Sequence, residues 1–226
     1  MKKIILIACT LMTCVAANAQ VSKLIRPKAE QSDPAARAVL DKVKKQYDAL
    51  KGYSADFVIE TELGDEKGKD KKGKLYIKGD KYRVEMADAD FMSDGVSKWS
   101  YLKKNKEVQL SNASETDDEG MTSPADLLKI YQKPNFIYAL MGENMEGGKT
   151  VQKIEFKPIR GFDDYSKVRV TIDKNSAQML NLKVFEKSGA RYTLKISNLV
   201  ANNALADTLF VWDKTKNADV KVINLK

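Results

Sequence analysis

Side chains that commonly do chemistry in enzymes are scarce in this chain. It has no histidine, and its two cysteines, Cys9 and Cys14, both lie close to the N-terminus. Histidine is the usual near-neutral base, cysteine is the strongest side-chain nucleophile, and both are common zinc ligands. The composition therefore favours a protein that binds or carries something over an enzyme.

The other candidates for catalysis or metal binding are carboxylates. Asp163 and Asp164 are adjacent, so in a strand or loop their side chains point apart, and no base or nucleophile accompanies them. The stretch Ser111–Ser123 is polar and acidic, but its spacing fits no calcium-binding loop. We interpret it as a solvated linker, with partner docking as the alternative. We expect neither a metal ion nor another cofactor.

Basic residues outnumber acidic ones, giving a formal net charge of +8. Most of them are dispersed, apart from a lysine cluster in Lys67–Lys74. We interpret this cluster as a solvated hairpin loop, with an acidic partner or an anionic lipid surface as the alternative. The sequence carries no known nucleic-acid-binding motif, so we expect no nucleic acid partner.

The N-terminus has the pattern of a secretory signal. A basic start, Met1–Lys3, precedes the apolar stretch Ile4–Ala16 and the small-x-small sequence Ala17–Ala19. This predicts a signal peptide over residues 1–19, cleaved so that Gln20 becomes the first residue. The apolar stretch is too short for a permanent membrane-spanning helix.

A second interpretation of the N-terminus is lipidation. Leu11–Cys14 loosely resembles a lipoprotein box in which Cys14 would carry a lipid anchor, but Thr13 replaces the small residue usual before the cysteine. Under the favoured cleavage the mature chain has no cysteine. Without disulfides, its stability must come from burial.

One helix is clearly predicted after the polar leader. Ser32 or Asp33 can cap it, Pro34 suits its first turn, and Gly52 suits its end. Apolar residues between these points recur at spacings of three and four, which gives one apolar stripe: Ala36, Val39, Leu40, Val43, Tyr47 and Leu50.

From Tyr53 onward the apolar period changes to two, which predicts about ten antiparallel strands. Asp94–Gly95, Lys174–Asn175 and Ser188–Gly189 have the composition of hairpin turns. Between the strands, Ser123–Tyr131 and Phe136–Gly142 are predicted as two short helical pieces separated by Pro134.

These elements predict an α+β, mainly β fold. Strands that alternate cleanly put one apolar face on the core, and a sheet this long must curl. We expect an incomplete antiparallel β-barrel, or curled sheet, with a lid of short amphipathic helices over its apolar concave face. Residues 20–226 would form this single domain.

Several motifs, taken in order, resemble those of a known family. They are a helix before Tyr53–Phe57, then Gly73–Lys78, Lys81–Glu85, Ser93–Gly95 followed by Trp99–Tyr101, and a late Asp207–Phe210. Together they resemble the periplasmic outer-membrane lipoprotein carrier family (LolA-like). The resemblance covers nearly the whole mature chain. Its one clear departure is Gly79–Asp80, where well-known members have an Arg-Pro whose arginine latches the lid.

The resemblance implies a periplasmic carrier that shelters acyl chains of lipoproteins, or of a related lipid, in an apolar cup. An inner-membrane lipoprotein-releasing transporter would load this monomeric carrier, and an outer-membrane acceptor would unload it. The alternative is a non-carrier sensor module on the same fold that detects lipids or mislocalised lipoproteins.

The ligand-binding residues of this cup are predicted from the apolar faces of the strands and helices. The sheet side comprises Phe57, Leu75, Ile77, Tyr82, Val84, Trp99 and Tyr101, and the lid side Leu40, Val43, Leu128 and Tyr131. Such side chains would bury acyl methylenes, each worth about 0.8 kcal/mol. No catalytic residue is assigned.

Overall fold

The computed structural model describes residues 32–113, 130, 136–159 and 164–226. Its elements, in chain order, are α1 (Pro34–Asp48), β1 (Tyr53–Leu63), β2 (Glu66–Lys67), β3 (Lys71–Lys78), β4 (Lys81–Met86), β5 (Ala89–Ser93), β6 (Ser97–Leu102), β7 (Glu107–Asn112), β8 (Phe136–Glu146), β9 (Lys149–Pro158), β10 (Tyr165–Asp173), β11 (Met179–Glu186), β12 (Ala190–Ala201) and β13 (Lys221–Asn224). Two short 3₁₀ turns, Lys103–Asn105 and Asp207–Phe210, complete the list.

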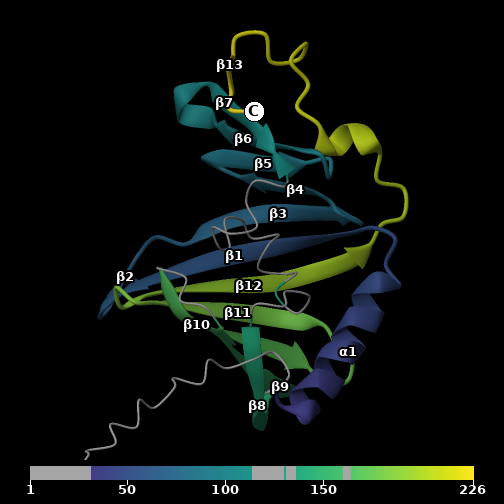
Figure 1. Cartoon of the computed structure of the whole chain (residues 1–226), viewed down its shortest axis with the longest axis vertical. Helices are drawn as coiled ribbons and strands as arrows, with labels where there is room; N and C mark the ends of the chain where they lie inside the picture. The colour runs from purple at the N-terminus through teal and green to yellow at the C-terminus, as the bar shows by residue number, and fades with distance from the viewer. Residues whose placement is uncertain (1–31, 114–129, 131–135, 160–163) are drawn as a thin grey trace, which may run out of the picture.

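The strands form one curled, unclosed sheet, so the mainly β prediction is confirmed (Figure 1). Its order is β13-β7-β6-β5-β4-β3-β1-β12-β11-β10-β9-β8, with the short β2 paired to β1. The sheet is thus two meanders, β1–β7 and β8–β12, joined where β1 pairs antiparallel with β12. Only the β13–β7 pair is parallel among the strand pairs of the described ranges.

Helix α1 forms where the sequence predicted it. Asp33 is its N-cap, with a carboxylate oxygen accepting from the Ala35 amide at 2.8 Å, and Pro34 occupies the first turn. Its predicted stripe is buried from Ala36 to Tyr47, whereas Leu50 lies beyond the helix and is partly buried. The helix lies beside the β8–β12 end of the sheet (Figure 1). The helix therefore covers one half of the sheet.

The predicted hairpin turns are also confirmed. Gly95 has φ +92°, a conformation that glycine adopts at little cost. The Asp94 carboxylate accepts hydrogen bonds from the amides of Val96 (2.9 Å) and Ser97 (2.7 Å). This turn joins β5 to β6 and fixes their register.

The predicted helical piece Phe136–Gly142 is wrong, because these residues belong to strand β8. Phe136, Tyr138 and Leu140 alternate onto the concave face, and β8 pairs with β9 along its whole length. The ladder shifts register between Leu140 and Gly142, where Gly142 has φ +131°. The other predicted helical piece, Ser123–Tyr131, lies outside the described residues except for Ile130.

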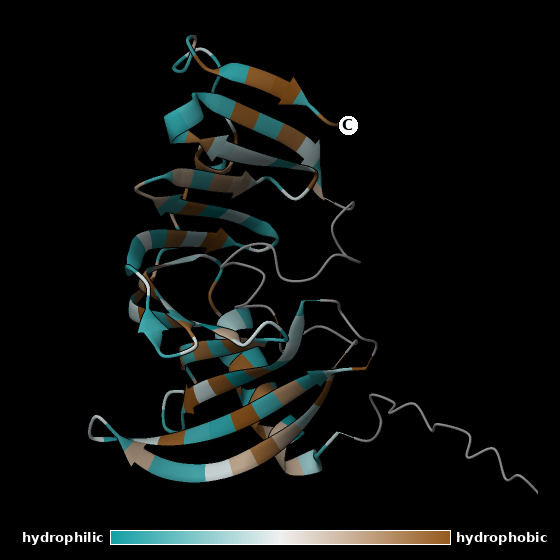
Figure 2. Cartoon of the chain, turned by 90° about the vertical axis from the view of Figure 1, so that its left-hand side faces the viewer, coloured by the Kyte–Doolittle hydropathy of each residue, from teal (hydrophilic) through white to brown (hydrophobic). Residues whose placement is uncertain are grey.

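Hydrophilic and hydrophobic residues alternate along several strands (Figure 2). Because successive side chains of a strand point to opposite faces, this alternation gives the sheet two chemically different faces. One face, together with the stripe of α1, forms a single cluster of buried apolar residues. This is the concave face. No helix in the described part of the chain is long and apolar enough to cross a membrane.

Candidate functional site

The concave face brings most of the predicted ligand-binding residues together. Leu75 lies opposite Val84, and Ile77 opposite Tyr82, on neighbouring strands. With Phe57 of β1 they belong to one buried cluster that also contains Leu40 and Val43 of α1. The predicted lid residues Leu128 and Tyr131 lie outside the described residues.

Helix α1 is attached to the edge strand β8 through its N-cap. The other carboxylate oxygen of Asp33 accepts the Leu140 amide at 3.0 Å, and the Asp33 amide donates to the Tyr138 carbonyl at 2.9 Å. The Ser32 hydroxyl accepts the Tyr138 amide at 3.3 Å. Hydrogen bonds from the Leu140 and Ala35 amides hold the pKa of Asp33 below its ordinary value. The cap therefore fixes the helix and also occupies the edge of the sheet.

The other end of α1 is held by Tyr47. Its hydroxyl accepts a hydrogen bond from the Met179 amide of β11 at 3.3 Å in a buried setting, and its ring packs edge-on against Tyr53 at 5.4 Å. Since both ends of α1 bond to strands, the helix is a fixed cover of the concave face.

The floor of the concave face is closed in this structure. Phe57 and Leu75 are each 2% exposed, Val84 and Val43 are fully buried, and Ile130 belongs to the same cluster at 0%. Side chains this buried are packed against other protein atoms. A shallow hollow of about 490 Å³ remains at the border of this floor, lined by Phe57, Gly73 and Met86 among others. Burial, with the charge of Asp164, also raises the pKa of Tyr165 in this cluster to about 12, so its phenol stays neutral.

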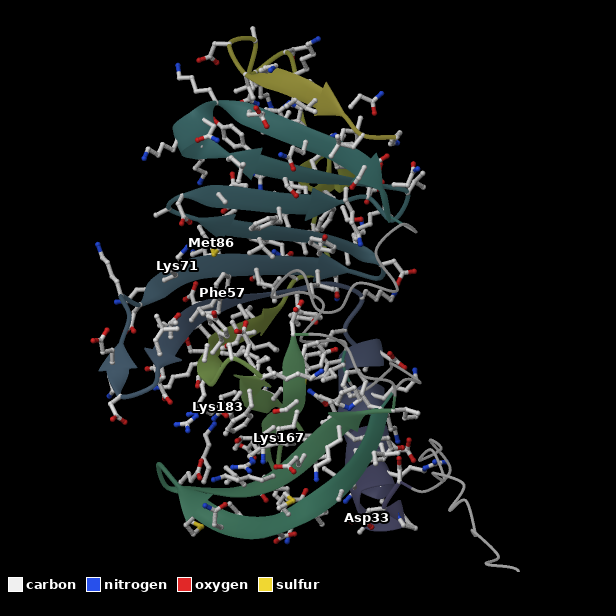
Figure 3. All side chains as sticks on the ribbon, turned by 60° about the vertical axis from the view of Figure 1, so that its left-hand side comes forward. Asp33, Phe57, Lys71, Met86, Lys167 and Lys183 are labelled. Carbon is white, nitrogen blue, oxygen red and sulfur yellow. The ribbon has the colours of Figure 1, made fainter. Side chains whose placement is uncertain are left out.

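A group of partly buried residues borders this floor. Its members are apolar, lie on the concave side of the sheet and pack against the buried cluster: Ile59, Met86, Phe91, Val184 and Ile196. We call this group the apolar rim. Its members are absent from the predicted set, although most stand at the same period-two positions. Figure 3 shows Met86 and Phe57 on the strands at the centre of the sheet.

The predicted positions of Trp99 and Tyr101 in the cup are wrong. Trp99 lies opposite Met92, which lies opposite Arg83, whereas Val84 lies opposite Phe91. Because neighbouring residues of a strand point to opposite faces, Trp99 and Tyr101 lie on the outer face, away from Val84. The sequence correctly predicts that Trp99 and Tyr101 share one face of their strand. It contains no pattern that tells whether this face is the concave or the outer one.

Tyr101 belongs instead to a second apolar region on the outer face. Its ring contacts Trp212 with centroids 4.7 Å apart, and Met92 and Phe210 are almost completely buried. A hollow of about 1030 Å³ lies between this part of the sheet and the C-terminal segment Ala204–Asn217. The C-terminal segment therefore acts as a separate cover for the outer face.

Three basic side chains hold this C-terminal segment. Lys78 donates to the Leu205 carbonyl and to Asp207, both at 2.8 Å, and Lys81 lies 3.2 Å from Asp207. Arg83 donates to the Leu209 carbonyl at 3.2 Å. Lys78 and Lys81 hold the pKa of the Asp207 carboxyl below its ordinary value. Arg83 therefore holds the C-terminal segment on the outer face. It does not take the place of the arginine that latches the lid in well-known family members. Gly79–Asp80, at the matching positions, form the β3–β4 turn.

The described ranges contain no group of three or more histidine, cysteine, aspartate or glutamate residues placed to hold a metal ion. Asp163, half of the carboxylate pair, lies outside them, as do most of the acidic stretch and the signal segment. What the concave face offers chemically is apolar burial next to a partly exposed rim.

These features define a class of protein in which a fixed helix covers the apolar concave face of a half-open antiparallel sheet. The chain belongs to the LolA family, since the model described as outer membrane lipoprotein carrier protein LolA matches residues 48–213. No curated protein matches it.

The chain is similar to several solved structures at low sequence identity. An uncharacterized conserved protein from Thermus thermophilus is 16% identical, with TM-score 0.58 over 84% of this chain and 99% of that one. The LolA superfamily protein NE2245 from Nitrosomonas europaea is 13% identical, with TM-score 0.45 over 78% and 97% of the two chains. The Mycobacterium tuberculosis lipoprotein LppX is 16% identical, with TM-score 0.46 over 77% and 98%.

Proposed function

We propose that this protein is a periplasmic carrier that shelters the acyl chains of lipoproteins, or of a related lipid, on its concave face. The observation that carries the proposal is the continuous apolar cluster that runs across both meanders and ends in the apolar rim. Membership of the LolA family and the N-terminal signal pattern support it.

The closed floor sets how a ligand would bind. An acyl chain would first contact the partly exposed rim and then displace packed side chains from the floor. Burying each methylene contributes about 0.8 kcal/mol, which would offset part of the packing that is lost. A site that must open before it fills would also release its ligand more readily than a preformed cavity, as a carrier requires.

The test is binding of a fluorescent acyl probe, such as a dansylated fatty acid, to the exported chain. Met86→Glu and Ile196→Glu place an unpaired charge on the rim and should reduce the affinity at least about tenfold, because a charge in an apolar site is costly. Val58→Glu is the matched control, since Val58 lies on the outer face of β1 between Phe57 and Ile59. Its affinity should stay near that of wild type.

Two results would reject the proposal: wild-type protein that binds no acyl probe, or equal losses in the rim variants and the control. The carrier also differs from the sensor alternative in what it does with its ligand. A carrier should move a labelled lipoprotein from inner-membrane to outer-membrane vesicles, with a releasing transporter and an acceptor as proposed partners. A sensor should bind lipid without net transfer.

A further inference from the structure

A second candidate surface lies on the outer face of β9–β12. Glu155 of β9, Arg169 of β10 and Lys183 of β11 are directly opposite one another across three strands. One row along, Lys167 lies opposite Phe185, which lies opposite Arg191 of β12. All of these side chains point away from the concave face. Figure 3 shows Lys167 and Lys183 together, below Phe57.

This surface, which we call the basic face, has more cations than carboxylates among the described residues. Its cations are Lys149, Lys153, Lys157, Lys167, Arg169, Lys183, Arg191 and Lys195, and its carboxylates are Asp56, Glu60, Glu62, Glu155 and Asp173. Strands about 4.8 Å apart make the surface roughly 19 Å wide from β9 to β1.

Most of the cations are more exposed than the carboxylates they pair with, although Lys183 (28%) and Glu62 (26%) are exposed about equally. The side chain of Glu155 is 9% exposed, whereas those of its partners Lys157 and Arg169 are 60% and 36% exposed. Glu62 is 26% exposed and its partner Arg191 is 50% exposed. A partner approaching this surface would therefore meet positive charge first.

Phe185 keeps three of these cations close together. Its ring centroid lies 5.0 Å from Lys167 Nζ, 5.3 Å from Arg169 Cζ and 5.8 Å from Lys183 Nζ, within cation–π range. Lys167 and Arg169 also donate to the same Glu155 oxygen, at 3.0 and 2.9 Å. Cations that would repel one another are thus held at fixed positions before any partner arrives.

From this arrangement we propose that the basic face docks an acidic segment of a partner protein. Charge complementarity carries the choice of an acidic partner. Geometry carries the choice of a protein over a membrane, because a bilayer held on the outer face would lie opposite the concave face and its rim. The choice of a protein over a membrane rests on the proposed lipid-binding function, whereas the choice of an acidic partner does not.

The test uses a fluorescein-labelled peptide of ten glutamates, whose binding is followed by fluorescence anisotropy at rising salt. Lys167→Gln/Lys183→Gln should weaken binding about tenfold, because ion pairs at an interface depend on matched charges. Lys104→Gln/Lys214→Gln removes the same charge from exposed positions elsewhere and should change the affinity less than about twofold. Phe185→Leu keeps every charge but removes the ring, so it should weaken binding about threefold.

Equal losses in the two double variants would overturn the proposal, because binding would then follow net charge alone. Wild-type protein that does not bind the peptide would also overturn it. So would phosphatidylglycerol vesicles that bind more tightly than the peptide and lose binding in Lys167→Gln/Lys183→Gln. Acyl-probe binding, measured on the same variants, should be unchanged. If wild-type protein bound the peptide but not the acyl probe, the carrier proposal would be rejected and the docking of an acidic segment would still stand.

Discussion

Phe57 and Gly73 lie directly opposite each other on β1 and β3, and the aromatic ring occupies the space that a side chain at Gly73 would need. A Cβ at position 73 would overlap the end of the Phe57 ring and the Glu85 carbonyl oxygen. The absence of a side chain at Gly73 therefore allows the Phe57 ring to extend over β3 on the concave floor.

Gly73→Ala should accordingly destabilise the protein by about 1–3 kcal/mol, the usual cost of overpacking. Chemical denaturation measures this cost. In a Phe57→Leu background the same substitution should cost less, because part of the overlap is gone. An identical cost in both backgrounds would show that the ring is not what excludes a side chain.

Gly95→Val should destabilise the β5–β6 hairpin by about 1 kcal/mol or more, because valine is strained at φ +92°. The neighbouring Val96 is 72% exposed, so Val96→Ala serves as the control and should have little effect. Thermal melting of the two variants provides the comparison. Equal melting temperatures would contradict the strained-turn explanation.

Tyr47→Phe removes the hydroxyl that accepts the Met179 amide and leaves a buried donor unpaired. The expected cost is about 1–3 kcal/mol, with faster hydrogen exchange at Met179 and in the last turn of α1. Tyr76→Phe, at a half-buried position on β3, is the control. Unchanged exchange in α1 would mean that Tyr47 does not hold the helix.

Arg83→Met should loosen the C-terminal segment, because the side chain donates to the Leu209 carbonyl and is only 23% exposed. We expect a loss of about 1–3 kcal/mol and a red-shifted emission of Trp212, recorded in a Trp99→Phe background. Acyl-probe binding should persist, since Arg83 lies on the outer face. Loss of probe binding without a change at Trp212 would place Arg83 in the lid after all.

Glu155 should make stability depend on acidity. Burial acts to raise the pKa of Glu155, but hydrogen bonds from Arg169 and Lys167 outweigh it and hold the pKa below its ordinary value. A carboxyl with a depressed folded pKa stabilises the protein above its unfolded pKa of about 4.3, and this stabilisation is lost as the pH falls through the folded value.

The difference in stability between wild type and Glu155→Gln should therefore be largest near neutral pH and shrink below about pH 4. Denaturation curves at several pH values measure it, with Glu66→Gln in the exposed strand β2 as the control. A difference that stays constant from pH 7 to pH 3 would contradict this account of Glu155.

The sequence predicted those features that depend on local periodicity and missed those that depend on contacts between distant residues. The α1 stripe and the alternation in β1, β3 and β4 depend on local periodicity, and the structure confirms them. Phe136–Gly142 fits both periods, and only its pairing with β9 makes it a strand. The outer position of Tyr101 depends on its contact with Trp212, which is 111 residues away in sequence and leaves no local pattern.

The strand order also has a consequence for how the chain folds. Each meander can form from neighbours in sequence, but the sheet becomes continuous only when β1, near residue 60, pairs with β12, near residue 195. Closing so long a stretch of chain costs entropy before the contact stabilises it. The β1–β12 junction should therefore be the late, slow event of folding. Until it forms, the apolar faces of both halves stay exposed, so a newly synthesised chain is most prone to aggregation during this interval.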